Sequence, residues 1–187
     1  PPPFWDSALE CQVREKILKP VAEELARMGS PYRGVLYGGL MLTESGPKVV
    51  EFNCRLGDPE AQVVLPRLKS DLLDIALRSS QGDLARADVE WSGPPCVAVV
   101  VASGGYPGEY RTGLPISGLD QVDEAVTVFH AGTCDSATGV ATSGGRVMTV
   151  TGTGRSLNEA REVAYANVSR IHFEDCFYRT DIAQNVC

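Results

Sequence analysis

The stretch Lys48-Val49-Val50-Glu51-Phe52-Asn53-Cys54-Arg55-Leu56-Gly57-Asp58-Pro59-Glu60 predicts a strand that runs into the start of a helix. Side chains two positions apart in a strand point to the same side, so Glu51 and Asn53 share one face while Val50 and Phe52 take the other. A carboxylate beside an amide oxygen offers the oxygen ligands that Mg²⁺ prefers. Arg55 follows two residues later, and its planar guanidinium suits phosphate or carboxylate. The spacing indicates two metal ligands and an anion binder, although a solvated glutamate and a turn asparagine fit it too.

Composition sets the broad class of the protein. The 187 residues allow one large domain or two small ones, and a hydrophobic content of 43% suffices for a sizeable core. The net charge is −7, and no basic patch is interleaved with aromatic residues, which argues against nucleic acid as a partner. No apolar run reaches about 18 residues, so we expect no membrane span. The N-terminus lacks Met and a signal-peptide pattern, which suggests a fragment of something longer.

The six cysteines form no C-x-x-C pair, and only two histidines accompany them. Both observations argue against a zinc site. A secreted disulfide framework would be denser in a shorter chain. We therefore expect free thiols in a reducing cytoplasm.

Residues 7–28 predict an amphipathic helix that ends at the capping residue Gly29. Pro20 removes one backbone hydrogen bond and should bend or split this helix. Its apolar stripe repeats every four residues: Leu9, Val13, Ile17, Val21 and Leu25.

Residues 34–43 and 48–53 predict an antiparallel hairpin, because 44–47 between them have turn chemistry. Gly38 and Gly39 weaken the first strand, so something should pack closely there. A cofactor, a bulge and a neighbouring backbone are all compatible with these glycines.

After the hairpin, Asp58 fits a helix N-cap and Pro59 the first helical position. Residues 59–80 are then expected to be helical, with a break at Pro66 and a restart at Ser70 or Asp71. Glu60 in the first turn is favoured by the helix dipole without any function. The second helix should bury Leu72, Leu73, Ala76 and Leu77.

The polar residues 81–95 are the best linker candidate, and the apolar run 97–102 predicts a buried strand. Residues 103–108 carry glycines but no Lys-Ser/Thr ending, which favours a tight turn over a phosphate loop. Short strands are expected at 126–131 and 145–151.

Ser156 and Glu159 form a capping box, which predicts a helix. His130 and His172 are isolated from any triad partner and are expected to be structural, and residues 178–182 predict an edge strand or a loop. The helix and the residues after it should bury Ala160, Val163, Ala164, Val168 and Ile171.

The strings 34–41, 51–60 and 68–72 resemble, in this order, the phosphoribosylamine–glycine ligases (glycinamide ribonucleotide synthetases) of the ATP-grasp superfamily. Residues 104–108, 129–133 and 144–147 resemble the C-terminal domain of that family. The resemblance implies an α/β fold of the α+β type. Residues 1–92 would form the C-terminal part of an ATP-grasp domain, an antiparallel sheet backed by helices, and 93–187 a small strand-rich C-terminal domain.

The resemblance also implies a reaction, in which ATP phosphorylates the carboxylate of glycine and 5-phosphoribosylamine attacks the glycyl phosphate. Glycinamide ribonucleotide, ADP and phosphate result, as an early step of purine synthesis. Glu51 and Asn53 fall on the family's metal positions, for Mg²⁺ or Mn²⁺. Arg55 would face the reacting carboxylate or acyl phosphate, with a structural ion pair as the alternative. Asp58 or Glu60 would hold the glycine ammonium, unless both serve only the helix start.

Two departures from the family pattern limit what the chain is expected to do alone. The strand at 35–41 contains no acidic residue, so phosphates and waters would complete the metal shell. The family's N-terminal part, with its flap and ATP-clamping residues, is missing, so the isolated chain should be inactive. The rival interpretations are another ATP-grasp carboxylate–amine ligase or carboxylase, and a non-catalytic interaction module on the same scaffold.

Overall fold

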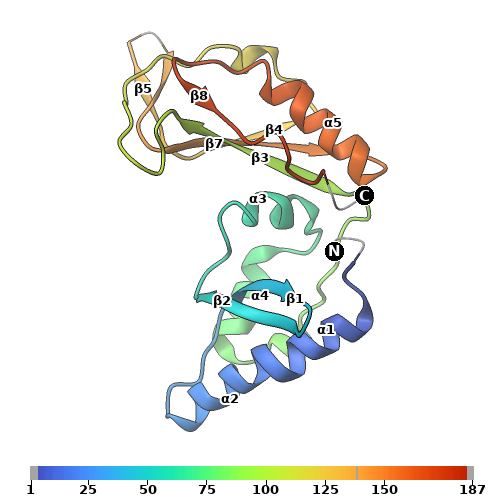
Figure 1. Cartoon of the computed structure of the whole chain (residues 1–187). Coiled ribbons are helices and arrows are strands. Elements are labelled where there is room, and N and C mark those ends of the chain that lie inside the picture. The colour runs from blue at the N-terminus through green and yellow to red at the C-terminus, as the bar shows by residue number, and fades with distance from the viewer. Residues whose placement is uncertain (1–3, 138, 185–187) are drawn as a thin grey trace. The chain divides into compact units, whose positions relative to one another are not determined.

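A computed structural model describes residues 4–137 and 139–184, which form two compact units. Unit 1 comprises residues 4–61 and Leu68–Trp91, and unit 2 comprises Gln62–Arg67 and residues 92–184. Helices occur in both units, and the strand ladders between described residues are antiparallel (Figure 1). The predicted α+β class is therefore confirmed. None of the described helices has the length and apolarity needed to cross a membrane.

The first helix of unit 1 is continuous but changes its hydrogen-bonding pattern midway. It consists of α1 (Ser7–Val13), a π-helical turn (Arg14–Leu18) and α2 (Lys19–Arg27). Pro20 has no N–H for the Lys16 carbonyl, and the wider π turn just before it, closed by the Lys19 N–H on the Arg14 carbonyl, accommodates this loss. The helix ends before Gly29, whose φ of +79° confirms the predicted cap. The predicted stripe is confirmed as the less exposed face of the helix.

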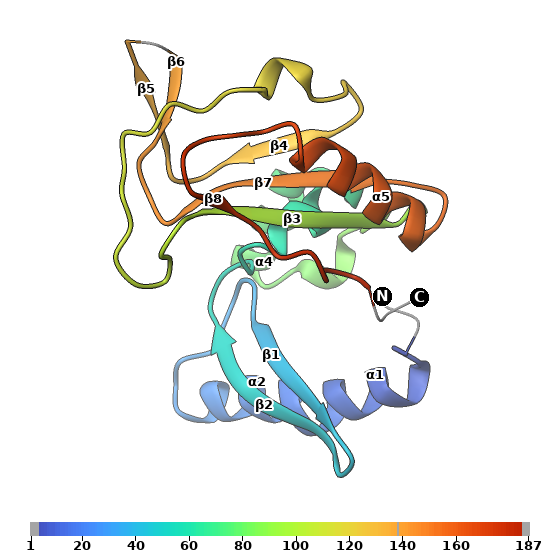
Figure 2. The ribbon, with the colours of Figure 1, turned by 45° about the horizontal axis from the view of Figure 1, so that its top comes forward.

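The predicted hairpin is confirmed as β1 (Tyr37–Thr43) and β2 (Gly46–Asn53). The helix α1–α2 runs along the hairpin (Figure 2). Leu18 of the helix lies near Gly38, because a Cβ built on Gly38 would be 3.5 Å from Cδ2 of Leu18. The ladder shifts by one residue between Gly39 and Leu40, so Val50 is an extra residue in β2. Of the three explanations for the glycines, a bulge is therefore the one observed.

The helix after the hairpin begins later than expected. Pro59 is preceded by a cis peptide bond and lies in a turn, and α3 (Ala61–Val64) starts where the Ala61 N–H bonds to the Gly57 carbonyl at 2.9 Å. The predicted placement of Pro59 as the first helical residue was therefore wrong. A 3₁₀ turn (Leu65–Arg67) confirms the break at Pro66, and Asp71 caps the restarted helix α4 (Leu72–Gln81). A further 3₁₀ turn spans Leu84–Arg86.

The apolar face predicted to be buried on α4 is exposed instead. Leu73 is 75% exposed, and Leu72 and Leu77 are also open to solvent. Periodicity identifies the apolar face of a helix, but it cannot say whether this chain contains what covers that face. Among the described residues of unit 1, Val13 is the one buried hydrophobic side chain, so unit 1 lacks a core of its own.

Unit 2 is built on a four-stranded sheet in the order β4-β7-β3-β8, with α5 (Leu157–Val168) across one face (Figure 2). The predicted buried strand is β3, and the two predicted short strands are β4 and β7. The turn at 103–108 is confirmed, since the Tyr106 N–H bonds to the Ser103 carbonyl. The strands span Cys96–Ser103 (β3), Thr127–His130 (β4), Thr133–Ser136 (β5), Gly139–Thr142 (β6), Arg146–Thr153 (β7) and Cys176–Phe177 (β8).

The core of unit 2 lies between the sheet and α5. Val99 and Val150 are opposite each other in the ladder and fully buried, and Ala160 and Ala164 meet them from the helix. Gly152 lets the helix approach closely, because a Cβ there would lie 2.6 Å from the backbone nitrogen of Ala164. The buried positions predicted for this helix are therefore confirmed, except that Val163 is only half-buried.

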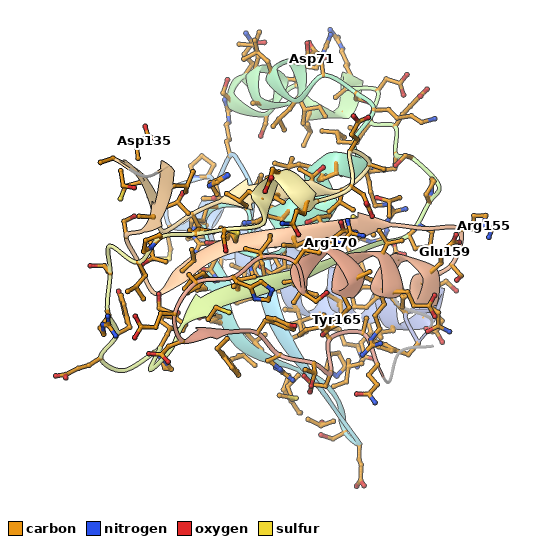
Figure 3. The ribbon with its side chains drawn as sticks, turned by 90° about the horizontal axis from the view of Figure 1, so that it is seen from above. Asp71, Asp135, Arg155, Glu159, Tyr165 and Arg170 are labelled. Carbon is orange, nitrogen blue, oxygen red and sulfur yellow. The ribbon has the colours of Figure 1, made fainter. Side chains whose placement is uncertain are left out.

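Arg155 and Glu159 lie at the N-terminal end of α5 (Figure 3), where the predicted residue Ser156 caps the helix. The Ser156 hydroxyl accepts the Glu159 N–H at 3.1 Å, and the Glu159 carboxylate accepts the N–H of Arg155 rather than that of Ser156.

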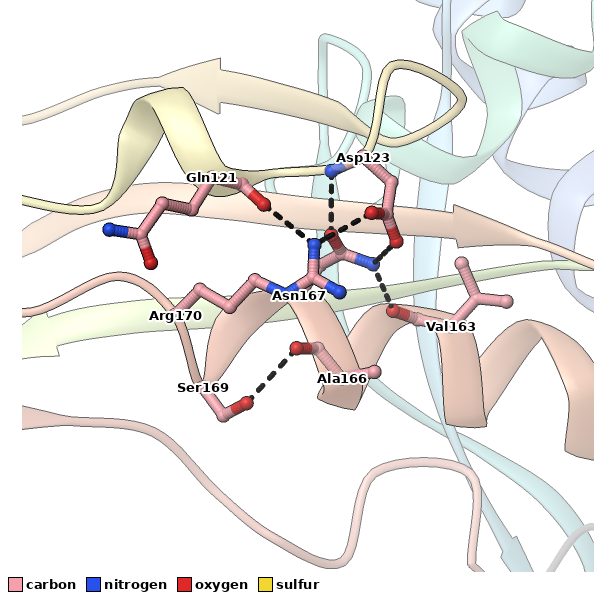
Figure 4. Close-up of polar contacts among 7 residues, drawn as sticks. All are labelled: Gln121, Asp123, Val163, Ala166, Asn167, Ser169 and Arg170. Atoms are coloured by element: carbon pink, nitrogen blue, oxygen red, sulfur yellow. Dashed lines mark hydrogen bonds and ion pairs between the residues drawn. The ribbon is translucent and has the colours of Figure 1, made fainter.

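At the other end of α5, the buried Asn167 ties the helix to the loop before β4 (Figure 4). Its Oδ1 accepts the Asp123 N–H at 2.8 Å, and its Nδ2 donates to the Asp123 carboxylate at 3.0 Å. Arg170 bonds the same carboxylate at 2.7 Å.

Candidate functional site

The predicted site residues line one cavity of about 270 Å³ within unit 1. The two hairpin strands supply one part of its wall, and the loop that follows β2 supplies the other. The lining residues are Tyr37, Gly39, Leu40, Val50, Glu51, Asn53, Arg55, Gly57, Asp58 and Glu60.

Glu51 and Asn53 lie side by side on β2, as the strand period predicts. The Asn53 amide nitrogen donates to Oε1 of Glu51 at 2.9 Å, which holds the two side chains together. This bond uses the nitrogen of the amide, so Oδ1 of Asn53 is the atom available to a cation beside the carboxylate. Glu51 is exposed and Asn53 half-buried, so neither is sealed into an apolar interior.

Gly39 faces Glu51 across the ladder and makes room for it. A Cβ at position 39 would lie 3.2 Å from Cγ of Glu51, closer than ordinary contacts allow. Phe52 packs toward Gly38 on the other face, as expected, but Val50 lines the cavity together with Glu51. The prediction that Val50 faces away was wrong, because the bulge interrupts the alternation there.

Arg55 lies in the loop beyond β2, and its Nη1 donates to the Leu56 carbonyl at 2.8 Å. The side chain is exposed and lines the same cavity as Glu51. The guanidinium therefore sits where it could meet an anion that is held next to Glu51 and Asn53.

Asp58 and Glu60 close the cavity from the loop. Tyr37, from the start of β1, lines the same cavity as Glu60. Partial burial, with the Glu60 and Glu51 carboxylates as further causes, raises the pKa of Tyr37 and keeps this phenol protonated. Glu60 also folds back over Gly57, where a Cβ would lie 2.9 Å from its carboxyl carbon.

The charges that line the cavity favour cationic groups of a ligand, and they provide one position for an anionic group. Three carboxylates (Glu51, Asp58 and Glu60) face one guanidinium (Arg55). Among residues 4–137 and 139–184, no group of three His, Cys, Asp or Glu side chains is arranged to hold a metal ion. A carboxylate with one amide oxygen nevertheless fits Mg²⁺, which usually keeps several waters and binds substrate phosphates.

The structure thus brings together all five residues that the sequence indicated, namely Glu51, Asn53, Arg55, Asp58 and Glu60. It adds Tyr37, Gly39 and Gly57, which the sequence analysis did not assign to the site. In the sequence, Gly39 indicated only that a cofactor, a bulge or a neighbouring backbone could lie close to the strand, and Gly57 carried no assignment. His130, by contrast, bonds Thr133 at 3.0 Å and lies outside the cavity, and Cys11, Cys54, Cys96, Cys134 and Cys176 are free thiols.

Comparison with protein families gives two matches in the same order as the two units. Residues 1–61 match the ATP-grasp (A) domain of phosphoribosylglycinamide synthetase, and residues 96–185 match the C domain of the same family. A phosphoribosylamine–glycine ligase from Caldanaerobacter subterraneus subsp. tengcongensis is 49% identical over 183 residues, which are 98% of this chain and 44% of that protein. The chain thus spans less than half the length of the curated relatives it matches.

Solved structures agree with these matches. The crystal structure of a phosphoribosylamine–glycine ligase from Thermotoga maritima superposes with a TM-score of 0.81 at 33% identity, over 96% of this chain and 44% of that one. The urea carboxylase of Kluyveromyces lactis superposes over 95% of this chain and 15% of that one, with a TM-score of 0.61 at 17% identity, which shows a shared fold alone. Both family models and the sequence relatives agree, and the chain belongs to the phosphoribosylamine–glycine ligase family.

Proposed function

We propose that this chain is the C-terminal part of an enzyme that ligates glycine to 5-phosphoribosylamine at the expense of ATP. The glycine carboxylate takes the γ-phosphoryl group to give glycyl phosphate and ADP. The amine of 5-phosphoribosylamine then attacks the carbonyl carbon, phosphate leaves, and glycinamide ribonucleotide is formed. The observation that carries the proposal is the placement of Glu51, Asn53 and Arg55 around one cavity in a chain of this family.

Glu51 and Asn53 would hold the divalent cation, Mg²⁺ or Mn²⁺, through a carboxylate and an amide oxygen. When bound, the cation neutralises charge on the transferring phosphoryl group. The hydrogen bond from Asn53 to Glu51 fixes the pair before any ligand arrives, so less ordering is needed on binding.

Arg55 would stabilise the negative charge on the carboxylate as it attacks and on the acyl phosphate that results. A guanidinium remains charged at every physiological pH and can bind two oxygens at once. Its present bond to the Leu56 carbonyl keeps the side chain along the cavity wall. Asp58 and Glu60 would hold the ammonium group of glycine at the loop side.

We assign residues 1–92 to the end of the ATP-grasp domain and 93–187 to the small C-terminal domain, which the separate family matches support. The remaining N-terminal part of the same enzyme would supply the nucleotide clamp and cover the exposed leucines of α4. The lack of a core in unit 1 supports this partner. We place the reaction in the cytoplasm, where free thiols such as those of this chain persist.

Replacing Glu51 by Gln in the full-length protein tests the proposal. The variant keeps the size of the side chain but loses the charge that binds the cation, so glycine-dependent ADP release should fall at least 100-fold. Glu44→Gln, in the exposed turn of the same hairpin, is the matched control and should retain full turnover. Near-normal turnover in Glu51→Gln would contradict the assignment.

The 187-residue chain alone should release no ADP, because the proposed nucleotide clamp belongs to the rest of the enzyme. Glycine-dependent ADP release by this chain would overturn that part of the proposal. Magnesium-dependent ATP binding by the full-length protein separates a ligase from a non-catalytic module on the same scaffold.

A further inference from the structure

The Tyr37 side chain enters the cavity from the start of β1, where it pairs with Asn53 in the ladder. It is half-buried, and it lines the same cavity as Glu60, whose carboxylate helps to raise the pKa of the Tyr37 hydroxyl. The neighbouring positions 38 and 39 are glycines, so no adjacent side chain in β1 requires a tyrosine at position 37 for packing. The hydroxyl therefore stands out as a polar group aimed at one functional side chain.

Gly57 leaves space for the same carboxylate. The residue is buried, and a Cβ there would lie 3.0 Å from Cβ of Glu60 and 2.9 Å from its carboxyl carbon. Gly57 is not among the glycines with positive φ, so its backbone conformation does not call for glycine. The missing side chain is what allows Glu60 to fold back toward Tyr37.

The chemistry of this contact leaves the carboxylate able to bind a second group. An ionised carboxylate has two oxygens with about four acceptor positions, and one phenol occupies a single position. A neutral donor also leaves the negative charge of Glu60 intact, whereas a lysine or arginine at position 37 would neutralise it. Glu60 is thus oriented but still attractive to a cationic amine.

We propose that Tyr37 is a positioning residue for the amino group of the amino-acid substrate, acting through Glu60. This inference rests on the proposed function, which places the glycine ammonium at the loop side of the cavity. Tyr37 holds one oxygen of Glu60, Gly57 provides the space, and the other oxygen receives the ammonium. The affinity for glycine, rather than for ATP, depends on the phenolic hydroxyl.

Tyr37→Phe in the full-length protein tests this role, because it removes the hydroxyl and keeps the ring. We expect KM for glycine to rise about 10-fold, as loss of one hydrogen bond in the binding site implies, while KM for ATP stays unchanged. Gly57→Ala should raise KM for glycine at least as much, since it pushes the carboxylate away. Tyr32→Phe is the matched control, because the Tyr32 hydroxyl bonds the Val35 carbonyl outside the cavity at 2.9 Å.

The outcomes distinguish the two proposals. If the wild-type protein shows no glycine-dependent ADP release, the proposed function itself fails. If the wild type is active and Tyr37→Phe leaves KM for glycine within twofold, the role of Tyr37 is refuted. If Tyr37→Phe lowers the apparent kcat and leaves KM for glycine and KM for ATP alike unchanged, the substitution has only reduced the active fraction of the protein. Tyr37 would then have a purely structural role, and the proposal is refuted.

Discussion

Asn167 offers the sharpest test of how unit 2 is held together. Its side chain is 1% exposed at the end of α5 and makes hydrogen bonds in three directions (Figure 4). Oδ1 accepts the backbone N–H of Asp123 and Nη1 of Arg170, and Nδ2 donates to the Asp123 carboxylate and to the Val163 carbonyl. Asn167→Ala removes these bonds together and leaves Arg170, through Gln121 and Asp123, as a remaining polar tie between the end of α5 and the loop before β4.

The cost follows from what each former partner does afterwards. The Asp123 N–H becomes a part-buried donor without a partner, which costs about 1–3 kcal/mol. The Val163 carbonyl, inside α5, and the exposed Asp123 carboxylate are satisfied by the helix and by water, so they add little. The lost packing of the buried Asn167 side chain adds to the cost of the unpaired Asp123 N–H. We therefore expect the free energy of unfolding to fall by about 2–3 kcal/mol.

Hydrogen exchange measured by mass spectrometry on peptides from β3 and β7 reports the opening of unit 2. Exchange in Asn167→Ala should be roughly 30- to 150-fold faster than in the wild type, the equivalent of the expected free energy. Ser169→Ala is the matched control, because the exposed Ser169 hydroxyl donates to the Ala166 carbonyl at 3.0 Å within the same helical turn. This substitution should change exchange less than threefold. Equal effects of the two substitutions would refute the reasoning.

Two other predictions concern the same unit. Arg170, and next Asn167, hold the pKa of Asp123 below its ordinary value of 3.8, so the stabilisation is complete above that pH and is lost as pH falls through the lowered pKa. Asp123→Asn should therefore lower Tm at pH 7, and its difference in Tm from the wild type should shrink as pH falls below 3.8. The exposed Asp135→Asn on β5 (Figure 3) should leave Tm unchanged, and a Tm difference for Asp123→Asn that stays constant with pH would count against the ion pair. Gly152→Ala places a Cβ 2.6–2.7 Å from backbone atoms of α5 and should lower the free energy of unfolding in urea by about 1–3 kcal/mol. Gly93→Ala is the control and should leave this free energy unchanged, because the space around Gly93 is open. An unchanged free energy in Gly152→Ala would show that the helix can move away.

Periodic patterns predicted the elements well where one face of each element is covered by the same chain. The apolar run at 97–102 and the spacing of Ala160, Ala164 and Val168 correspond to the two sides of the core in unit 2. The same reasoning failed on α4, where Leu72, Leu73 and Leu77 form an apolar face that no described residue buries. A sequence pattern records what an element requires for burial, but the covering group can belong to another part of the protein.

The strand period predicted that Glu51 and Asn53 lie together, yet it could not predict Tyr37 as their neighbour. From the turn, Thr43 pairs with Gly46 and Leu40 with Val49, and continuing this register would pair Tyr37 with Phe52. Directly opposed residues share a face, so Tyr37 would then have pointed away from the site. The extra residue Val50 shifts the ladder by one, which pairs Tyr37 with Asn53 and Gly39 with Glu51. A single bulge thus decides which β1 side chains lie on the same face as Glu51 and Asn53. The spacing of residues within β2 does not predict this bulge.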